Sequence, residues 1–590
     1  MNLAMLFGLF GAVLALLVWG RWRYDLVAFG ALILAVLLGL VPGDEAFAGF
    51  GHEATIIVAL VLIISRGLVN SGAIQFVTRN LMDATRSLAS HIVIMGGTGA
   101  VLSAFMNNVA ALALLMPADI QTAKKARRSP KLSLMPLSFA TILGGLATLI
   151  GTPPNIVIAS FREDALGTPF AMFDFAPVGL ACAAAGLAFI ALVGWRLIPQ
   201  PDGTADPAEG LAQLDEFIAE LTVPEESEVV GRRVHELDEK AEKADVAVIG
   251  LVRSGRRLFG AARAETIRPG DGILIEASPE ALEEFKNELG LAYESRGRRK
   301  IDPAGEGLSL MQVAVPETAM IVNRSSLSLQ LLRHRGVTLL GISRRGRRIG
   351  GRVRREAVQA GDILLLLGPS ERLADVAAWL GCLPLEGRRM TVEQREKAPL
   401  AGGIFGMAVL AASLGLADLP AALGAVVVLY VMTGIVPLRD IYDYIEWPVI
   451  VLLGSLIPLG IALEETGGTA LLSSALLDWT EVLPLWAILA ILMALTMALS
   501  AVLNNVATAL ILGPIAVDMS RQLEVNPDPF LMAVAVAASC AFLTPIGHKN
   551  NTLILGPGGY AFGDYWRMGL PLEVIIIAVA VPAILIFWPF

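Results

Sequence analysis

Two short segments, each with a pair of adjacent asparagines inside an apolar stretch, are the parts of this chain best suited to chemistry. Asn107 and Asn108 lie in the segment 105–117 (FMNNVAALALLMP), and Asn504 and Asn505 lie 397 residues later in the segment 502–514 (VLNNVATALILGP). An Asn side chain offers one acceptor oxygen and two amide donors without a fixed charge. Such pairs can hold a small ion in apolar surroundings.

Each asparagine pair is followed by a second interruption of the apolar sequence. Residues 150–155 read IGTPPN and residues 546–551 read IGHKNN, an offset of 396, at which Thr148 also matches Thr544. Pro and Gly free backbone carbonyls that need another partner inside a membrane. Sodium is a suitable partner because it is a hard cation that prefers oxygen. His548 and Lys549 are open to two interpretations, an ionisable functional pair at membrane depth or residues at the cytoplasmic mouth.

One such interruption alone usually only kinks a helix or supplies hydrogen bonds across a bundle. Here the same two interruptions recur at matched positions in both halves of the chain. Paired interruptions in corresponding halves are typical of the binding sites of carriers built from inverted repeats. We therefore expect a binding site rather than two accidental kinks.

The composition indicates which elements must position these residues. The chain has 590 residues, of which 55% are hydrophobic and 17% charged, and 61 of its 99 Lys, Arg, Asp and Glu residues lie within 200–398. The remainder consists of apolar stretches of about 17–25 residues, long enough to cross a bilayer. The cysteines Cys182, Cys382 and Cys540 form no C-x-x-C pair, which argues against a disulfide framework or a zinc site. We expect an α-helical polytopic membrane protein with a soluble insert.

The apolar stretches predict about ten crossings and two re-entrant hairpins, at about 90–119 and 485–516, whose tips carry the asparagine pairs. An odd number of crossings separates equivalent points, so the halves are expected to be inverted repeats. Basic loops place the insert on the cytoplasmic side of the plasma (inner) membrane. The predicted parts are a first membrane repeat at 1–199, an insert in two parts, 200–300 and 301–398, and a second membrane repeat at 399–590.

The insert contains a duplication of its own. Residues 248–257 (VIGLVRSGRR) match 339–348 (LLGISRRGRR) at an offset of 91, and 268–276 (RPGDGILIE) match 359–367 (QAGDILLLL). A Gly-Asp turn that leads into a short apolar strand is expected in each copy. The insert is thus predicted to be a tandem pair of small α+β domains, with a linker at about 200–224. The arginines between Arg344 and Arg355 could grip a phosphate, although a solvated face is the simpler interpretation.

The asparagine tips and helix breaks resemble those of the divalent anion:sodium symporters, within the ion transporter superfamily. Members of that family carry a Ser-Asn-Thr triplet at each tip; the matching positions here are Asn107, Asn108, Val109 and Asn504, Asn505, Val506. The insert resembles two regulator-of-potassium-conductance C-terminal (TrkA-C) domains, which a sulfate-transporting branch of the family carries at this place. The resemblance implies a homodimer with elevator-type alternating access, and a sensor in the insert with a nucleotide as one candidate ligand.

The same resemblance implies the site residues. The first sodium site would comprise Asn107, Asn108, Gly151 and Asn155, and the second Asn504, Asn505, Thr544, Gly547 and Asn551. The anion would lie between the tips, near Asn107, Asn108, Val109, Thr152, Asn504, Asn505, Val506 and Pro545. The loss of both tip hydroxyls puts dicarboxylates in doubt and favours sulfate or a related small oxyanion. Nucleic acid is not an expected partner.

Several alternatives remain at this point. A dicarboxylate symporter would share the scaffold. An arsenite exporter or a sodium/proton antiporter would also share it, but an antiporter is expected to carry an Asp or Glu at the helix breaks, and both breaks lack one. A channel gated by the insert would favour a symmetric pore. A membrane enzyme lacks a nucleophile and base near either break, and no P-loop motif supports an ATP-driven pump.

Overall fold

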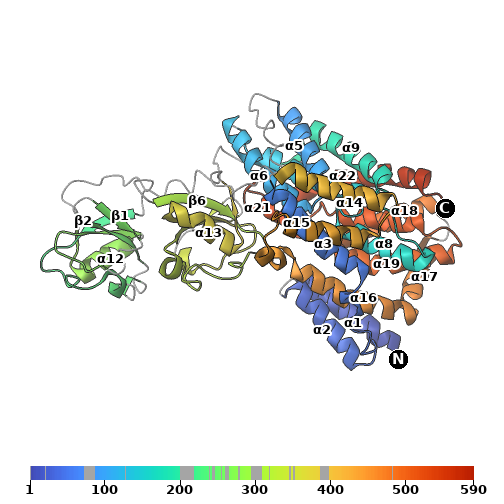
Figure 1. The fold of residues 1–590 in the computed structure, drawn as a ribbon, viewed down its shortest axis with the longest axis horizontal. Helices are drawn as coiled ribbons and strands as arrows, with labels where there is room; N and C mark the ends of the chain where they lie inside the picture. Colours follow the sequence, from blue (N-terminus) through green and yellow to red (C-terminus); the bar gives the residue numbers. More distant parts are fainter. Residues whose placement is uncertain are drawn as a thin grey trace. The chain divides into compact units, whose positions relative to one another are not determined.

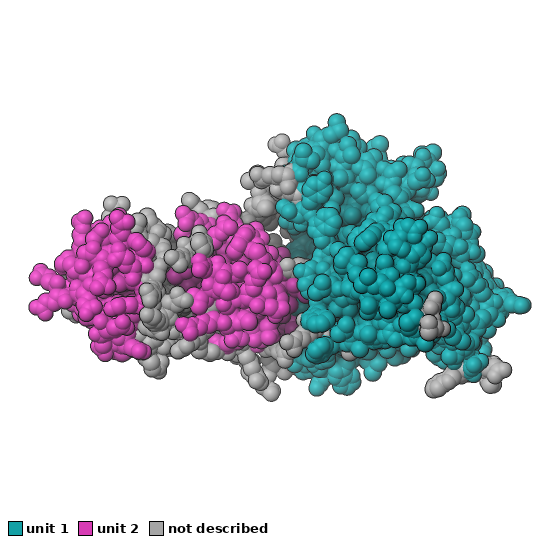
Figure 2. Space-filling view, turned by 90° about the horizontal axis from the view of Figure 1, so that it is seen from below, with its two compact units in different colours: residues 1–200, 390–554, 561–590 teal, residues 201–389, 555–560 magenta. Residues whose placement is uncertain are grey.

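The computed structural model describes most of the chain, and it forms two units (Figure 2). The described residues are 2–19, 22–71, 87–126, 128–199, 218–237, 240–241, 246–253, 256–259, 265–276, 279–293, 308–317, 319–344, 347–349, 353–385, 397–480 and 483–590. Unit 1 comprises 1–200, 390–554 and 561–590, and unit 2 comprises 201–389 and 555–560.

The described residues of unit 1 form helices joined by turns and loops, with no strands (Figure 1). Its first half contains α1 (Asn2–Trp19), α2 (Tyr24–Leu37), α3 (Glu53–Asn70), α5 (Leu88–Ser103), α6 (Asn108–Lys125), α7 (Lys131–Gly144), α8 (Pro153–Leu166) and α9 (Ala176–Leu192). Its second half contains α14 (Ala398–Ser413), α15 (Leu419–Met432), α16 (Trp447–Glu465), α17 (Gly468–Thr480), α18 (Leu485–Ser500), α19 (Asn505–Gln522), α20 (Asp528–Ser539), α21 (Lys549–Leu555) and α22 (Tyr565–Phe587).

The two halves pack their helices in the same way and against each other. Helix α5 packs on α7 in the first half, and α18 packs on α20 in the second. Contacts between the halves include α2 with α16, α3 with α15, α8 with α19 and α9 with α22. All twelve residues of α20 are buried, and so is every residue of α7 except Leu132. Helices that are apolar on every side belong in a protein interior, so α7 and α20 form the centre of unit 1.

Both predicted helix breaks are present in this centre. Helix α7 continues into a short 3-10 turn, Gly145–Ala147, and the chain is not helical again until α8 begins at Pro153. In the second half, α20 ends at Ser539 and α21 begins at Lys549. Pro at the first helical positions suits α8, because a helix start needs no amide hydrogen there.

Three helices are long and apolar enough to cross a membrane by length and composition, among the described residues: Ala48–Asn70 (with its preceding turn), Trp447–Glu465 and Phe562–Phe587. Nine further apolar helices are shorter, because breaks and turns divide the apolar stretches. The number of crossings therefore stays a prediction. Helix α17 lies in a stretch for which the sequence predicts no element, since its thirteen residues are too few for a crossing.

Unit 2 contains two five-stranded antiparallel sheets. The strands of the first are β1 (Ile218–Thr222), β2 (Ala247–Arg253), β3 (Arg256–Phe259), β4 (Gly272–Glu276) and β5 (Ala292–Tyr293), and those of the second are β6 (Leu308–Ala314), β7 (Thr338–Arg344), β8 (Arg347–Arg348), β9 (Ile363–Pro369) and β10 (Leu383–Pro384). One helix accompanies each sheet, α12 (Pro279–Leu289) and α13 (Ser370–Leu380). The linker prediction for 200–224 was wrong at its end, because Leu221 of β1 is fully buried in the first core.

The two small domains share one topology. Their strand orders are β3-β2-β4-β1-β5 and β10-β6-β9-β7-β8, which are the same order when each strand is replaced by its counterpart in the other copy. An irregularity in the register falls at Val248/Gly250 in one sheet and at Leu339/Gly341 in the other, again 91 residues apart. The internal duplication read from the sequence therefore corresponds to two copies of one α+β fold.

The aspartate of each Gly-Asp turn in these domains is bound by an arginine. The Arg253 guanidinium donates to both carboxylate oxygens of Asp271, at 3.0 and 2.8 Å, and Arg344 does the same to Asp362, at 3.0 and 2.9 Å. Burial raises the pKa of Asp271, but the Arg253 hydrogen bond opposes it and the net pKa is lowered. Arg344 is thus already bound to carboxylates, which does not favour the phosphate-binding interpretation for it.

Candidate functional site

The first asparagine of each pair caps a helix. Asn107 Oδ1 accepts from the backbone amide of Val109 at 2.8 Å, and Asn504 Oδ1 accepts from that of Val506 at the same distance. Helices α6 and α19 begin directly after these residues. Asn is a favoured capping residue because its side chain satisfies an amide that has no partner within the helix. The tip geometry is therefore built locally by the sequence.

The second asparagine of each pair is bound to the preceding helix. Ser103 donates its hydroxyl to Asn108 Oδ1 at 2.5 Å, and Ser500 donates to Asn505 Oδ1 at 3.0 Å. These serines are the last residues of α5 and α18. The bond fixes the side-chain oxygen and so the orientation of the amide group. Both tips therefore present a preorganised Asn side chain rather than a mobile one.

The tips are also tied to the helix breaks. The Thr544 hydroxyl donates to the carbonyl of Ala501 at 2.5 Å, and the Thr148 hydroxyl donates to that of Ala104. Within each break, Asn155 donates to the Thr148 carbonyl at 2.9 Å, and Asn551 donates to the Thr544 carbonyl at 3.2 Å. Each of these hydrogen bonds has a counterpart 396 or 397 residues away.

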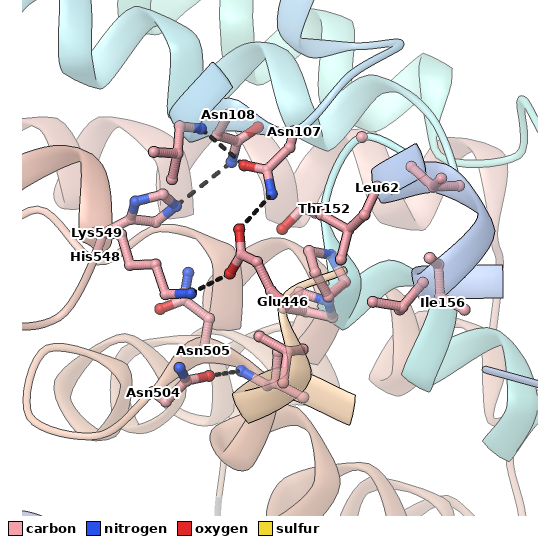
Figure 3. Close-up of a pocket in the computed structure, with 18 of the residues that line it drawn as sticks. Leu62, Asn107, Asn108, Thr152, Ile156, Glu446, Asn504, Asn505, His548 and Lys549 are labelled. Atoms are coloured by element: carbon pink, nitrogen blue, oxygen red, sulfur yellow. Dashed lines mark hydrogen bonds and ion pairs between the residues drawn. The ribbon is translucent and has the colours of Figure 1, made fainter. Parts of the chain in front are cut away.

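Both tips and both breaks meet at one cavity (Figure 3). Its volume is about 90 Å³, enough for several water molecules or one small polyatomic anion. Nine of the predicted site residues line it: Asn107, Asn108, Val109, Gly151, Thr152, Asn504, Asn505, Val506 and Gly547. Asn155, Thr544, Pro545 and Asn551 do not line it, and the Pro545 carbonyl accepts from Thr552. Helices α3 and α16 add apolar side chains from Val58, Leu62 and Val449.

Three of the long helices begin at this cavity, in addition to the seven-residue helix α21, which begins at Lys549. The first residues of α6, α8 and α19, namely Asn108, Pro153 and Asn505, all line it. A helix N-terminus carries a partial positive charge and unpaired amide donors, both of which attract anions. Helix α8 begins with two prolines, so it supplies its dipole without the first two donors. The arrangement therefore favours negative charge in the cavity.

One charged residue of the cavity was not predicted from the sequence. Glu446, immediately before α16, forms an ion pair with Lys549 and accepts from Asn107 Nδ2 at 3.4 Å. His548 Nε2 lies 3.4 Å from Asn108 Nδ2. Lys549 and His548 thus both face the cavity. The sequence was searched for carboxylates only at the two breaks, which lack one, whereas Glu446 comes from a helix start 103 residues before Lys549.

Oxygen atoms gather behind the first tip. A Cβ added to Gly145 would lie 2.6 Å from Asn108 Oδ1 and 3.1 Å from the Gly151 carbonyl oxygen, so both oxygens lie close to this backbone. Asn155 Oδ1 is buried and has no hydrogen-bond partner among the described residues. Side-chain and carbonyl oxygens of this kind are the donors that a hard cation takes. In the second half the corresponding Asn551 Oδ1 accepts from Ser138 at 2.9 Å.

An arrangement of helix breaks around a small cavity is typical of membrane transporters, and comparison with known proteins agrees with it. The citrate transporter (CitMHS) family model matches residues 14–520 and 484–590. The chain belongs to the citrate transporter family. It is therefore an integral membrane transporter and not an enzyme, as the sequence predicted. The anion-carrier type of the resemblance is confirmed, since this family is of the ion transporter or divalent anion:sodium symporter type.

Individual relatives fit this assignment. An uncharacterized transporter of Synechocystis is 31% identical over 94% of this chain and 92% of its own length. Sodium/sulfate cotransporter 1 of Chlamydomonas reinhardtii is 24% identical over 55% of this chain and 39% of its own. Among solved structures, the YdaH transporter of Alcanivorax borkumensis matches 94% of this chain and 89% of its own, with 14% identity and a TM-score of 0.42.

Proposed function

We propose that this chain is a sodium-coupled symporter of a small divalent oxyanion, with sulfate as the first candidate. The observation that carries the proposal is the convergence of three helix N-termini on a small cavity that also contains Lys549 and the Asn tips. The sodium/sulfate cotransporters among the relatives support both the ion and the cargo. An oxyanion has several acceptor oxygens, which suits a cavity lined by amide donors.

Two sodium sites accompany the anion in this proposal. The first uses oxygens of Asn107, Asn108, Gly151 and Asn155, and the second those of Asn504, Asn505, Thr544, Gly547 and Asn551. The buried Asn155 Oδ1, which lacks a hydrogen-bond partner, supports the first site. Two sodium ions with one dianion would make transport electroneutral. A third sodium ion would make uptake electrogenic, worth about 2.3 kcal/mol per 100 mV.

The rest of the proposed architecture follows the duplicated hydrogen bonds. Their recurrence in both halves supports two inverted repeats whose tips and breaks move together as one body. This movement would be an elevator-type cycle, and the protein would be a homodimer. The two copies of the α+β fold form a cytoplasmic regulatory insert of the TrkA-C type, with the protein in the plasma (inner) membrane. The anion would bind in the cavity of Figure 3, and each sodium ion at one of the tips that line it, with Asn155, Thr544 and Asn551 behind that lining.

A second candidate cargo is citrate or a dicarboxylate, because the matching family model is described as a citrate transporter. Neither tip has the Ser and Thr hydroxyls that the resemblance assigns to carboxylate binding, which favours a small oxyanion. Glu446 also places a carboxylate in the cavity. The lack of a carboxylate at the breaks was the argument against a sodium/proton antiporter, so the uptake experiment includes that alternative.

Uptake into proteoliposomes separates these candidates. The purified protein is reconstituted, and radiolabelled sulfate uptake is measured with and without an inward sodium gradient, in competition with thiosulfate, succinate, citrate and arsenite. We expect sodium-dependent sulfate uptake that thiosulfate inhibits more strongly than citrate does. Sodium-driven uptake of citrate or succinate without sulfate uptake, or sodium-driven proton movement, would contradict the proposal and select the corresponding alternative.

A further inference from the structure

The Glu446–Lys549 pair occupies the place that the proposed function gives to the cargo anion. Both side chains line the cavity, and they are partly buried, at 26% and 21% exposure. One carboxylate oxygen of Glu446 faces Lys549 Nζ, and the other accepts from Asn107 Nδ2. The carboxylate therefore joins the tip of the first half to the break of the second. Figure 3 shows it between the two asparagine tips.

The pair is not a by-product of the duplicated scaffold. The hydrogen bonds of the tips and breaks recur in both halves, but the position equivalent to Lys549 at the offset of 396 is Pro153. Glu446 directly precedes α16, whereas the residue that directly precedes α3, the corresponding helix of the first half, is His52. The first half therefore has neither a carboxylate nor a lysine at these two positions. The charge pair is thus an addition to one half only.

Electrostatics makes the carboxylate and a cargo anion mutually exclusive. A dianion that entered beside Glu446 would face a like charge at close range in a partly desolvated cavity, which is strongly unfavourable. If the Glu446 side chain leaves, the dianion meets Lys549, the Asn107 amide and the helix N-termini instead. Glu446 precedes α16 in a non-helical conformation, so its side chain can turn away without disturbing that helix.

We propose that Glu446 is a tethered substitute for the cargo, a specificity-determining residue that neutralises Lys549 in the empty carrier and that the oxyanion displaces. This inference rests on the proposed function. An unpaired charge at membrane depth is costly, so the pair lets the empty carrier return with a neutral cavity. Glu446 thus weakens anion binding and speeds the return step, and Lys549 strengthens anion binding.

The test compares net uptake with exchange in proteoliposomes of the full chain. For Glu446→Gln, we expect the KM for sulfate to fall about threefold to tenfold, because the anion no longer competes with the Glu446 carboxylate for Lys549. A tenfold fall corresponds to about 1.4 kcal/mol. The ratio of counterflow exchange to net uptake should rise at least about threefold, since exchange needs no return of the empty carrier. Lys549→Met should raise the KM. Glu464→Gln, an exposed carboxylate at the far end of α16, is the matched control and should behave as wild type.

The outcomes are distinct. A wild-type KM and a wild-type exchange ratio in Glu446→Gln, while the wild type transports sulfate, would overturn this inference and leave the proposed function standing. No sodium-dependent sulfate uptake by the wild type would refute the proposed function and this inference with it. If Glu446→Gln does not fold, Glu446→Asp takes its place: withdrawal of the shortened carboxylate from Lys549 should lower the KM in the same direction, and an unchanged KM would overturn the inference.

Discussion

Each helix break packs against a glycine of a helix further along the chain. A Cβ added to Gly179 of α9 would lie 2.3 Å from the carbonyl oxygen of Leu146, and one added to Gly569 of α22 would lie 2.3 Å from that of Phe542. Ordinary van der Waals contact begins near 3.4 Å. Gly179→Ala or Gly569→Ala must therefore push the break away by about 1 Å or bend the helix. Such overpacking usually costs about 1–3 kcal/mol.

The sign of this effect distinguishes packing from helix propensity. Ala is a better helix former than Gly by about 1 kcal/mol, so a glycine without neighbours should gain stability on this change. Gly402 of α14 serves as the control, because a Cβ added there would have no atom within 4 Å. We expect Gly179→Ala and Gly569→Ala to lower the thermal unfolding midpoint in detergent, and Gly402→Ala to leave it unchanged or raised. Equal midpoints for all three variants would refute the reasoning.

Two further predictions concern buried charge. Asp271→Asn should cost about 1.5–3 kcal/mol of local stability, because it breaks the charged hydrogen bonds to Arg253; amide hydrogen exchange in β2 and β4 would measure it. Burial raises the pKa of Asp271, but the hydrogen bonds and charges of Arg253 and Arg268 together outweigh burial and lower the pKa. The Arg253–Asp271 pair therefore stabilises the fold above the unfolded pKa of about 3.9, and this stability is lost as the pH falls through the lower folded value. Equal exchange protection of wild type and variant at pH 7 would contradict this. In unit 1, His91 lies 2.6 Å from the fully buried Asp119, so His91→Ile alone should cost about 3–5 kcal/mol. The double variant His91→Ile with Asp119→Ala should regain most of the lost thermal stability. Both new residues are those of the second half at the equivalent positions, Ile488 and Ala516. A double variant no more stable than His91→Ile alone would count against the explanation.

The sequence was sufficient to bring the two tips and two breaks into one hypothesis, and the structure places nine of the predicted residues around one cavity. This grouping has a physical basis, because Asn, Pro and Gly interrupt an apolar pattern and the duplication marks the interruptions as equivalent. The different roles within each pair were not predictable. That Asn107 caps a helix while Asn108 receives a serine hydroxyl depends on the backbone turn of the tip.

Long-range contacts account for the other differences. Glu446 reaches Lys549 from a distant part of the sequence, and no local pattern indicates which cavity a residue before a helix will enter. Strand β1 was hidden because the acidic residues around Leu221 gave its segment the composition of a linker. The sequence showed a repeated Gly-Asp turn but not the pairing of Arg253 with Asp271. Which residues face each other across a sheet depends on the register of its strands.

The central claim, that one cavity binds sodium and an anion through both asparagine tips, is tested most directly by sodium-dependent sulfate uptake in Asn108→Ala and Asn505→Ala. Asn287→Ala, on an exposed face of α12, is the matched control. We predict that each tip variant loses most of the uptake or needs a much higher sodium concentration, while the control transports as wild type. Wild-type uptake with wild-type sodium dependence in either tip variant would contradict the two-tip site.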